Sequence, residues 1–530
     1  MRNSRRRLYA TAIAAAAVPM ITAAPAAANA ARPSTAAGPD WIRNVQWTSQ
    51  PVAPGVTVRH GVLSAQTAPR WTVTIDGTTT SSITGQPADT EVGTRAWANQ
   101  TASQLKADGY APQLTDVNWP DYSDTPHGLE GVRVRTGNFS TQAEAQSLAT
   151  TLQGKGFSTA TAEWTGYDSD TSPDGEQIHE AIIDPRRARV EITHHGDVAQ
   201  RQTTSSVAKA LNALVATNAG FFITSDSFGF QGVPDGIAVY DGQLESMNNG
   251  PRAALVISNG RPSIANLQAS VTVRAGHASY AVNGINRIPG IVQDCGRPGS
   301  TPTDQPRQDI TCHESSELVM FTDKLGTATP SGSGTQAVIG PDGTVQSVGA
   351  QSGGDVPAGG RIIQGTGAAG TWLAQHVSAG QHLDISERVS DTAGRAIPLT
   401  PGLSIASAAP VLVKNGQTAI DARTEGVIDP ADLSFNYAWA EIRQPRTIVG
   451  IAKNGDLILV TVDGREPGTS EGSTLSEEAD LMKSLGAVTA MNLDGGGSTA
   501  MAVNGSLVNQ TSDATGERPD GDFVAALPAS

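Results

Sequence analysis

The chain has 530 residues, too many for one ordinary hydrophobic core, so two or three domains are expected. Its formal net charge is -15, from 51 acidic and 36 basic residues. Because nucleic acids are polyanions, this charge argues against a nucleic-acid partner.

The first 30 residues carry the three parts of a secretory signal peptide. Arginines within residues 2–7 are followed by an alanine-rich apolar run and by small residues that end at Ala30. We therefore expect cleavage after Ala30 and a secreted protein. The stretch SRRRL also resembles a twin-arginine signal, so both export routes stay open. Residues 31–65 are expected to be a leader and linker, and no later stretch is apolar and long enough to be a transmembrane segment.

A pattern of small and apolar residues occurs twice between residues 66 and 166. Its helical spacing predicts two helices, each ended by a glycine and followed by an aromatic residue. Residues 71–75 and 132–135 are predicted strands, one before each helix. A strand and a helix that occur twice predict a small β-sheet with two helices on one face. The matching pairs are Ala96/Ala143, Ala98/Ala145, Ala102/Ala149, Leu105/Leu152, Gly109/Gly156 and Tyr110/Phe157.

This repeat region, residues 66–166, resembles the SPOR domain family, whose members bind the glycan strands of peptidoglycan. Residues 132–139 (VRVRTGNF) and 143–157 (AEAQSLATTLQGKGF) carry the resemblance. It implies that peptidoglycan glycan strands are a partner and that the protein is cell-wall associated. The alternative is a structural α+β module that only spaces the ends of the protein.

A second region runs from residue 176 to residue 530 and consists mainly of short apolar strands separated by Gly, Pro, Asn and Asp. Two stretches are predicted helices, residues 206–220 and 474–487, and the second has a capping box formed by Thr474 and Glu477. The predicted fold class is α+β. We expect a catalytic domain built on a mixed sheet, preceded by the small sheet-and-two-helix domain.

Two cysteines, Cys295 and Cys312, lie in one segment rich in Gly, Pro and Asp. Because an exported chain meets an oxidising environment, we expect them to form a disulfide. The alternative is a metal site with His313, which lacks the paired Cys-x-x-Cys spacing of structural zinc.

The stretch MNLDGGGSTAM at residues 491–501 places an acid, three glycines and two hydroxyls between two predicted strands. Asn504-Gly505, directly downstream, is a type I′ hairpin signal. A hairpin needs at most two glycines for positive φ, so the third favours close approach of a ligand to the backbone. The alternative is a polar loop without function.

Further polar motifs lie elsewhere in the second region. Asn218 precedes two aromatic residues that could form a sugar platform, and arginines precede a predicted strand at residues 443 and 446. Asp463 and Arg465 follow the next strand. Each motif alone is also compatible with a turn or a solvated strand edge.

Together these motifs resemble the phosphodiester glycosidase family, which includes the enzyme that uncovers mannose 6-phosphate by removing N-acetylglucosamine. The resemblance spans about residues 176–530. One departure is that the chain continues after GERP as DGDFVAAL, which is more acidic than the usual apolar strand. The matching residues are 218–222, 446–447, 463–465, 474–475, 477, 492–498 and 517–519.

The resemblance implies hydrolysis of a sugar-1-phosphodiester at the C1–O bond, releasing a free sugar and a phosphomonoester. A carboxylate must attack C1 or activate water. Asp494 and Asp463 are the two leading candidates, with Glu517 behind them, and retention or inversion stays open. The departing phosphate needs charge stabilisation more than a strong acid, and Arg446 is expected to supply it with Arg465 or Arg518.

The other expected contacts with substrate are hydrogen bonds from the glycine amides and from polar side chains. No dense carboxylate or histidine cluster demands a metal, so no cofactor is expected, although a calcium ion held by Asp and loop carbonyls remains an alternative. The expected substrate-binding residues are Asn218, Asn492, Gly495, Gly496, Gly497, Ser498, Arg465 and Arg518.

Two functions remain open on the sequence. The first is a secreted phosphodiester glycosidase held on the wall by the repeat region. The second is a non-catalytic wall-binding protein that uses the same pocket as a lectin. Acids beside arginines favour catalysis. Because each region has enough apolar periodicity for its own core, we also expect binding and catalysis to be separable.

Overall fold

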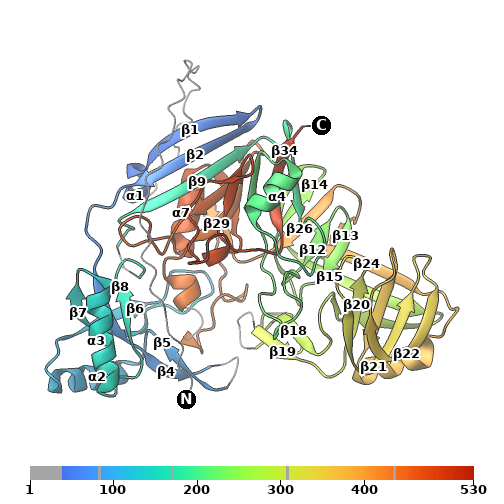
Figure 1. Ribbon diagram of the computed structural model, residues 1–530, viewed down its shortest axis with the longest axis horizontal. Helices are drawn as coiled ribbons and strands as arrows, with labels where there is room; N and C mark the ends of the chain where they lie inside the picture. The colour runs from blue at the N-terminus through green and yellow to red at the C-terminus, as the bar shows by residue number, and fades with distance from the viewer. Residues whose placement is uncertain (1–38, 82–84, 169–170, 306–309, 434–436, 530) are drawn as a thin grey trace.

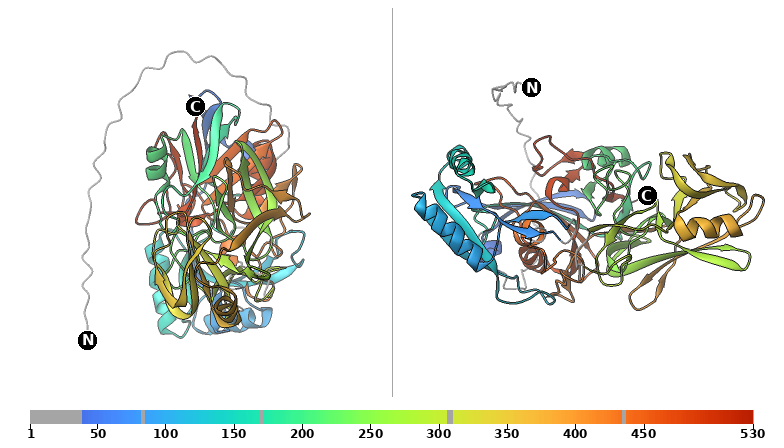
Figure 2. Two further views of the ribbon diagram at one scale, coloured as in Figure 1. Left: turned by 90° about the vertical axis from the view of Figure 1, so that its right-hand side faces the viewer. Right: turned by 90° about the horizontal axis from the view of Figure 1, so that it is seen from below.

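The computed structural model describes residues 39–81, 85–168, 171–305, 310–433 and 437–529. The predicted signal peptide, residues 1–30, lies outside this part of the chain. None of the helices that the structure describes is both long and apolar enough to cross a membrane. The molecule is elongated, with a small helical lobe at one end, a central stack of sheets, and a β-rich lobe at the other end (Figures 1 and 2).

The central sheet is antiparallel throughout and collects strands from both ends of the chain. Its strand order is β1 (Gln46–Ala53), β2 (Val56–Leu63), β9 (Glu176–Ile183), β30 (Leu457–Val462), β29 (Arg446–Ala452), β31 (Ala487–Asn492), β27 (Val411–Lys414) and β28 (Gln417–Thr418). The expectation of a linker over residues 31–65 is therefore wrong from Asp40 onward, because α1 (Asp40–Asn44), β1 and β2 belong to this fold.

Both faces of the central sheet are covered. Alternate residues of β30 enter two different cores: Ile458 and Val460 pack with α7 (Leu475–Ser484), whereas Leu459 packs toward the second and third sheets. All residues of β30 are buried, which explains why LILVTV reads as a continuous apolar run. The predicted capping box begins α7 as expected, with Thr474 as its N-cap.

The second sheet is also antiparallel and lies beside the central sheet (Figure 1). Its order is β10 (Ala188–Thr193), β34 (Phe523–Pro528), β11 (Val215–Asn218), β32 (Met501–Val503) and β33 (Ser506–Leu507). Helix α4 (Thr204–Leu211) packs on it through Ala208. The helix predicted over residues 206–220 is thus half correct, because Asn212 adopts a left-handed conformation (φ 51°) and the chain turns into β11.

The far lobe is built from long β-hairpins and α5 (Gly367–His376). The third sheet runs β13 (Gln243–Ser246), β12 (Ala238–Tyr240), β26 (Leu403–Ser407), β14 (Arg252–Ser258), β15 (Arg261–Ala275), β24 (Asp384–Asp391) and β25 (Ala396–Ile397), and β16 (Ala278–Val282) pairs with β15. The fourth runs β17 (Gly284–Ile285), β20 (Leu318–Thr322), β23 (Arg361–Gly365), β21 (Thr329–Ile339) and β22 (Val345–Gly354). In the described part of the chain, β17 and β20 form the single parallel pair, so the expected mixed sheet is almost wholly antiparallel.

The predicted disulfide is present. Cys295 ends β18 (Ile291–Cys295) and Cys312 lies in β19 (Ile310–His313), and the two strands form a separate hairpin with the cysteine Cα atoms 6.3 Å apart.

The repeat region forms the small sheet and two helices that its pattern predicts. The sheet order is β6 (Pro112–Asn118), β7 (Leu129–Phe139), β3 (Trp71–Ile75) and β8 (Ala160–Trp164), with α2 (Arg95–Ala107) and α3 (Gln142–Gly154) packed into one core with β3 and β7. A short hairpin, β4 (Gly77–Thr80) and β5 (Pro87–Thr90), accompanies it. Gly109 and Gly156 follow the helices with φ of 87° and 103°, as expected of C-terminal glycines.

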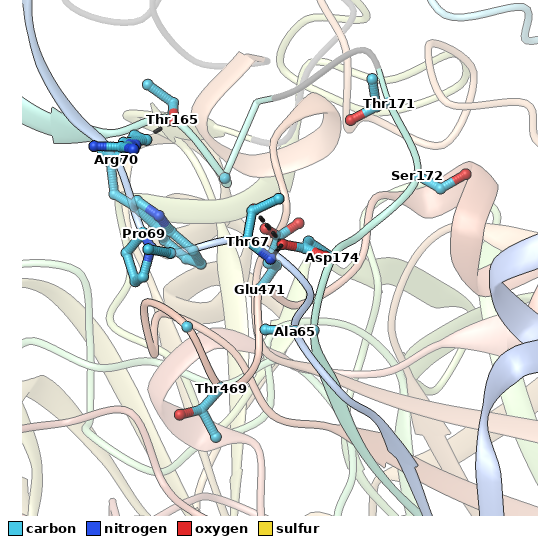
Figure 3. A pocket seen from close by; sticks show the side chains of 15 residues that line it. Ala65, Thr67, Pro69, Arg70, Thr165, Thr171, Ser172, Asp174, Thr469 and Glu471 are labelled. Atoms are coloured by element: carbon cyan, nitrogen blue, oxygen red, sulfur yellow. Dashed lines mark hydrogen bonds between the residues drawn. The ribbon is translucent and has the colours of Figure 1, made fainter. Parts of the chain in front are cut away.

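This domain does not precede the rest of the fold but is inserted into the central sheet. It leaves after β2 and returns at β9, and these strands pair with Leu63 opposite Glu176. A cavity of about 140 Å³ lies where the chain enters and leaves the inserted domain (Figure 3). There the Asp174 carboxylate accepts hydrogen bonds from the consecutive N–H groups of Gln66 and Thr67, at 2.8 and 2.9 Å. The entering and leaving segments are thus tied together.

The inserted domain also shares a core with the central sheet. Tyr122 is 3% exposed and packs in the same cluster as α7, with Trp119 against it. The buried Arg443 guanidinium donates to the Gly166 carbonyl at 2.9 Å, and the Arg443 N–H donates to the Tyr167 carbonyl at 2.7 Å. The expectation that the two regions have independent cores is therefore wrong on this face.

Candidate functional site

The glycine loop, residues 494–499, is not a turn between neighbouring strands. It leaves β31 of the central sheet and enters β32 of the second sheet, with a 3-10 turn at Gly496–Ser498. The predicted hairpin follows directly, because Asn504 and Gly505 have φ of 49° and 75° between β32 and β33. The loop therefore bridges two layers, and its polar groups lie at their junction.

Each glycine of this loop is required for a different reason. A Cβ on Gly495 would lie 2.8 Å from the Pro445 carbonyl oxygen, and Gly496 has a φ of 60°. A Cβ on Gly497 would overlap the guanidinium of Arg518 and the carboxylate of Asp513. We expected close approach of a ligand to explain the third glycine, and the groups that approach it here are Arg518 and its partner Asp513.

Replacing Gly497 by Ala is expected to weaken substrate binding with little loss of stability. The new methyl group overlaps the guanidinium of Arg518 and the carboxylate of Asp513, a partly exposed ion pair that must move aside, so the free energy of unfolding should fall by about 1 kcal/mol. KM for an anionic substrate should rise severalfold. Gly349→Ala is the matched control, because a Cβ there meets nothing within 4 Å. Equal KM values for the two variants would show that Arg518 does not bind substrate.

Asp494 occupies the first position of the loop and remains partly exposed. Its N–H donates to the Ala219 carbonyl at 2.9 Å, and its Oδ1 accepts the Gly495 N–H at 3.0 Å. Burial raises the pKa of Asp494 to about 6, against the opposing effects of the Ser498 hydroxyl and Arg518. Asp494 is therefore a carboxylate at neutral pH that can still take a proton.

Two arginines lie over the same loop. Arg465 is exposed, adopts a φ of 61°, and binds the Gln444 side chain at 2.9 Å through Nε. Arg518 pairs with Asp513 through two hydrogen bonds of 2.8 and 3.0 Å. Partial burial lowers the pKa of Arg465, and the positive charge of Arg518 lowers it further. Arg465 approaches Gly496 and Arg518 approaches Gly497, so the two cations border neighbouring positions of the loop. Their shared positive charge favours an anion at this place.

Arg446 lies behind the glycine loop rather than beside Arg465. It is 1% exposed, and its Nε contacts the Ser473 carbonyl at 2.9 Å and the Glu478 carboxylate at 3.1 Å. Burial lowers its pKa. Its guanidinium also lies 5.2 Å from the ring centre of Trp439. These partners give Arg446 a structural task, which is to hold β29 against α7 beneath the loop.

Asp463 is 1% exposed and supports the far end of the loop. Its Oδ1 accepts a hydrogen bond from Asn509 at 3.1 Å, and its Oδ2 accepts the Gln510 N–H at 3.0 Å. The same Asn509 amide donates to the Thr499 carbonyl at 3.1 Å and accepts the Met501 N–H at 2.7 Å. Asp463 thus acts on the loop through Asn509.

The remaining residues of the expected site also have structural partners. Asn218 donates to the Asp494 carbonyl at 2.7 Å and accepts the Thr447 hydroxyl at 2.7 Å, so it fixes the loop rather than a sugar. Asn492 donates to the Ala409 carbonyl at 2.7 Å. Glu517 accepts the N–H of Ser205 at 2.7 Å in the first turn of α4. Of the expected residues, Arg465 is exposed, and the partly exposed ones are Asp494, Gly495, Gly496, Glu517 and Arg518.

The residues that sequence reasoning missed are Asp520 and Asp522, which directly precede β34. Asp522 accepts hydrogen bonds from the Gly220 N–H at 2.7 Å and the Tyr240 hydroxyl at 2.9 Å, and burial raises its pKa to about 6. Burial raises the pKa of Asp520 well above its usual range, and the charge of Asp494 raises it further. The acidic departure DGDF was the available signal, and it marks two acids beside Asp494.

One group of described side chains could hold a metal ion by geometry, and it lies in the inserted domain. Glu91, Glu163 and Asp168 place ligand atoms within 4.8 Å of one another. Arg135 pairs with Glu163 at 2.9 Å and also contacts Asp168, so two of these three acids take part in an ion-pair network. Calcium at the glycine loop stays a hypothesis.

Two family models match the chain. A phosphodiester glycosidase model matches residues 333–526, which include the glycine loop, Arg465, Arg518 and Asp520. A SPOR domain model matches residues 91–161, which include α2 and α3. The chain carries a phosphodiester glycosidase domain and a SPOR domain. The SPOR domain is the inserted one.

Curated relatives share parts of this sequence. The bovine N-acetylglucosamine-1-phosphodiester alpha-N-acetylglucosaminidase is 27% identical over 289 residues, which are 52% of this chain and 48% of that protein. The mouse enzyme of the same name is 31% identical over 117 residues, 22% of each chain. An uncharacterized SPbeta prophage-derived protein of Bacillus subtilis (strain 168), YomE, is 40% identical over 77 residues, 14% of this chain and 12% of that protein. The chain thus spans about half or less of these relatives.

Solved structures extend the similarity beyond the phosphodiester glycosidase match. A crystal structure from Burkholderia pseudomallei K96243 is 29% identical and has a TM-score of 0.79 over 93% of this chain and 98% of that chain. A Synechocystis protein shares the fold at a TM-score of 0.52 and 17% identity, over 92% of this chain and 76% of that chain. The whole arrangement of SPOR domain and sheets therefore occurs in another solved protein.

Proposed function

We propose that this protein is a secreted hydrolase that cleaves the glycosidic bond of sugar-1-phosphodiesters and is held on peptidoglycan by its SPOR domain. The observation that carries the proposal is the combination at the glycine loop. Asp494, a partly exposed carboxylate with its pKa raised to about 6, lies on the same loop as Gly496 and Gly497, which Arg465 and Arg518 approach.

This combination suits the chemistry of a phosphodiester. The reacting carbon C1 needs a carboxylate that attacks it or deprotonates water. Asp494 is the candidate because it is partly exposed, whereas Asp463 is buried and Glu517 is held by the N–H and hydroxyl of Ser205. The leaving group is a phosphomonoester, whose developing charge needs cations. Arg465 and Arg518 supply them, and Arg518 also lies 3.5 Å from the Ser498 hydroxyl. Asp463, Arg446 and Glu517 support the fold around this site.

The SPOR domain supports an extracytoplasmic, cell-wall location, because the family binds peptidoglycan. The start of the chain supports export independently through its arginines and apolar run. A wall-bound hydrolase would meet sugar phosphodiesters of wall polymers or other glycoconjugates at high local concentration.

The test is hydrolysis of a panel of sugar-1-phosphodiesters, N-acetylglucosamine-1-phosphomethyl ester among them, by the mature full-length protein. In H₂¹⁸O, cleavage at C1–O places the label in the free sugar, whereas cleavage at P–O places it in the phosphate. Label in the sugar supports the proposal. Binding of these esters without turnover, measured by calorimetry, would instead support the non-catalytic glycan-binding protein.

A further inference from the structure

Two aromatic rings, those of Phe221 and Trp439, form a pair beside the glycine loop. They meet edge to face, with ring centres 5.9 Å apart and ring planes at 74°. This is a favourable geometry for two aromatic side chains. Both residues are partly exposed, whereas Phe222, the second aromatic residue of the same sequence motif, is buried. The two rings that solvent can reach are therefore Phe221 and Trp439, and not the neighbours Phe221 and Phe222.

Phe221 is tied to the start of the loop through the backbone. It lies two residues after Ala219, whose carbonyl accepts the Asp494 N–H at 2.9 Å. Because two residues span at most about 7 Å, Phe221 lies beside Asp494. The Phe221 N–H donates to the Ser407 carbonyl at 3.2 Å, and its ring packs against the cores on both faces of the central sheet. Phe221 thus stands at the end of the sheet where the loop leaves it.

Trp439 is tied to the next residue of the loop through Arg446. Its carbonyl accepts a hydrogen bond from the Arg446 guanidinium at 2.8 Å, and this guanidinium lies 5.2 Å from the centre of its ring. The Cδ atom of Arg446 would lie 3.6 Å from a Cβ on Gly495. The Arg252 guanidinium lies over the Phe221 ring in the same way, at 4.8 Å. Because both arginines are buried and paired with acids, the two rings are held in fixed places.

The aromatic pair and the two cations of the site border different parts of the loop. The rings are tied to its first two residues, whereas Arg465 and Arg518 approach its second and third glycines. Asp494 therefore has aromatic rings on one side along the loop and positive charge on the other. A sugar-1-phosphodiester has the same order, because C1 joins a sugar ring to an anionic phosphate.

The proposed reaction also leaves the sugar ring in need of a partner. Asn218 and Asn492, which were expected to bind it, donate to backbone carbonyls of the fold. A pyranose ring presents C–H groups on its face, and this apolar face can lie flat on an aromatic side chain. Small-molecule sites combine such apolar contacts with a few charged or polar groups. The aromatic pair supplies the apolar contacts at this site.

We propose that Phe221 and Trp439 form the subsite for the sugar ring and select a pyranose phosphate over the phosphate of an acyclic polyol. This inference rests on the proposed hydrolysis at Asp494. The rings bind the C–H face of the pyranose, so that C1 lies at Asp494 and the phosphate at Arg465 and Arg518. Glycerol phosphate has no ring face, so the same site binds it through the phosphate alone.

Two ligands that share a phosphate test the proposal by calorimetry on the full-length protein. Wild type should bind N-acetylglucosamine 1-phosphate about 5- to 30-fold more tightly than glycerol 3-phosphate, as expected of an added ring contact. Trp439→Leu and Phe221→Leu should remove most of this preference and leave the Kd of glycerol 3-phosphate within about twofold. Trp439→Phe keeps a ring and should retain the preference within about threefold. Arg518→Gln should weaken both ligands equally.

The matched control is Trp372→Leu in the far lobe. Trp372 is also partly exposed and also pairs with a second ring, that of Tyr280, with centres 5.2 Å apart. Its loss should change neither Kd. A wild-type protein without preference between the ligands, or leucine variants that keep it, would overturn the proposal. So would equal weakening of both ligands in Trp439→Leu, because the rings would then support the fold and not the sugar.

Turnover distinguishes this inference from the proposed function. In an active enzyme the leucine variants should raise KM for N-acetylglucosamine-1-phosphomethyl ester about 5- to 30-fold and leave kcat within about threefold, because no reacting group changes. If wild type hydrolyses no ester yet the rings select the sugar phosphate, only the proposed function fails. If the ester is hydrolysed with the same KM by wild type and by both leucine variants, only the aromatic subsite fails.

Discussion

Asp494→Asn is expected to lower kcat on a sugar-1-phosphodiester by roughly 10²- to 10⁴-fold. An amide can neither attack C1 nor take a proton from water, whereas the change is nearly isosteric. The variant should fold, because the loop is held by the backbone contacts of Asp494 with Ala219 and Asn218, which the substitution leaves intact. It should also still bind peptidoglycan sacculi, because the SPOR domain is untouched.

The pH dependence of the wild-type enzyme follows from the same residue. Burial raises the pKa of Asp494 to about 6, and catalysis needs its ionised form. The rate should therefore fall as pH drops through about 6. Full activity of Asp494→Asn, or a wild-type rate that is flat from pH 7 to pH 5, would show that the glycine loop is a structural turn and not an active site.

The free energy of unfolding should depend on pH in the opposite direction to the rate, because it falls as pH rises. The folded-state pKa of Asp494 lies above the unfolded value of about 3.9, so its contribution to stability is present below about pH 4 and is lost as pH rises through about 6. At pH 8 the folded protein must hold an ionised Asp494, which is unfavourable there, whereas the Asn variant carries no charge at this position. The Asn variant should therefore be more stable than wild type by about 2 kcal/mol, a figure already reduced because the side chain is partly exposed. A gain in stability with a loss of activity is expected of a residue kept for chemistry.

Arg443→Met is expected to destabilise the protein by about 3–5 kcal/mol. Arg443 is 2% exposed and pairs with Glu471 at 3.0 Å and Glu477 at 2.7 Å. It also donates to the carbonyls of Gly166 and Thr171, where the chain leaves the SPOR domain. Its loss leaves the buried Glu471 and the partly buried Glu477 without their cation and removes a link between the domains. The midpoint of urea unfolding measures this loss.

The matched control is Arg189→Met, because Arg189 is exposed and its ion pair with Glu191 spans 3.2 Å at the surface. Such pairs contribute about 0–1 kcal/mol. In Arg443→Met, limited proteolysis should also begin at residues 164–175. An unfolding midpoint equal to that of Arg189→Met would show that Arg443 does not stabilise the contact between the SPOR domain and the central sheet.

The insertion of the SPOR domain also changes what an excision experiment can show. Because Leu63 and Glu176 are paired, a short linker can replace residues 66–166 and leave β2 and β9 as a hairpin. Excision nevertheless removes Tyr122 from the core around α7. The separation of binding and catalysis is better tested by substitutions on the exposed surface of the SPOR domain.

Local signals in the sequence were sufficient for the elements that depend on near neighbours. The helices of the SPOR domain, the capping box of Thr474 and Glu477, and the hairpin at Asn504-Gly505 form where their patterns predict. Helix periodicity, caps and type I′ turns involve residues within about four positions, so a single sequence is enough to find them. The glycine loop could also be found from the sequence as a motif, but the residues that surround it in space could not.

Tertiary structure alone decided which of the polar residues meet. Sequence patterns treat Arg446 and Arg465 alike, yet pairing of β29 with β30 buries the first behind the loop and leaves the second exposed above it. In the sequence, Asp520 was notable only because it makes the segment before an apolar strand more acidic than usual. In the structure, β34 pairs with β10 and β11 and so places Asp520 beside Asp494. Contacts between residues far apart in the chain depend on strand order, which the local pattern of each strand does not encode.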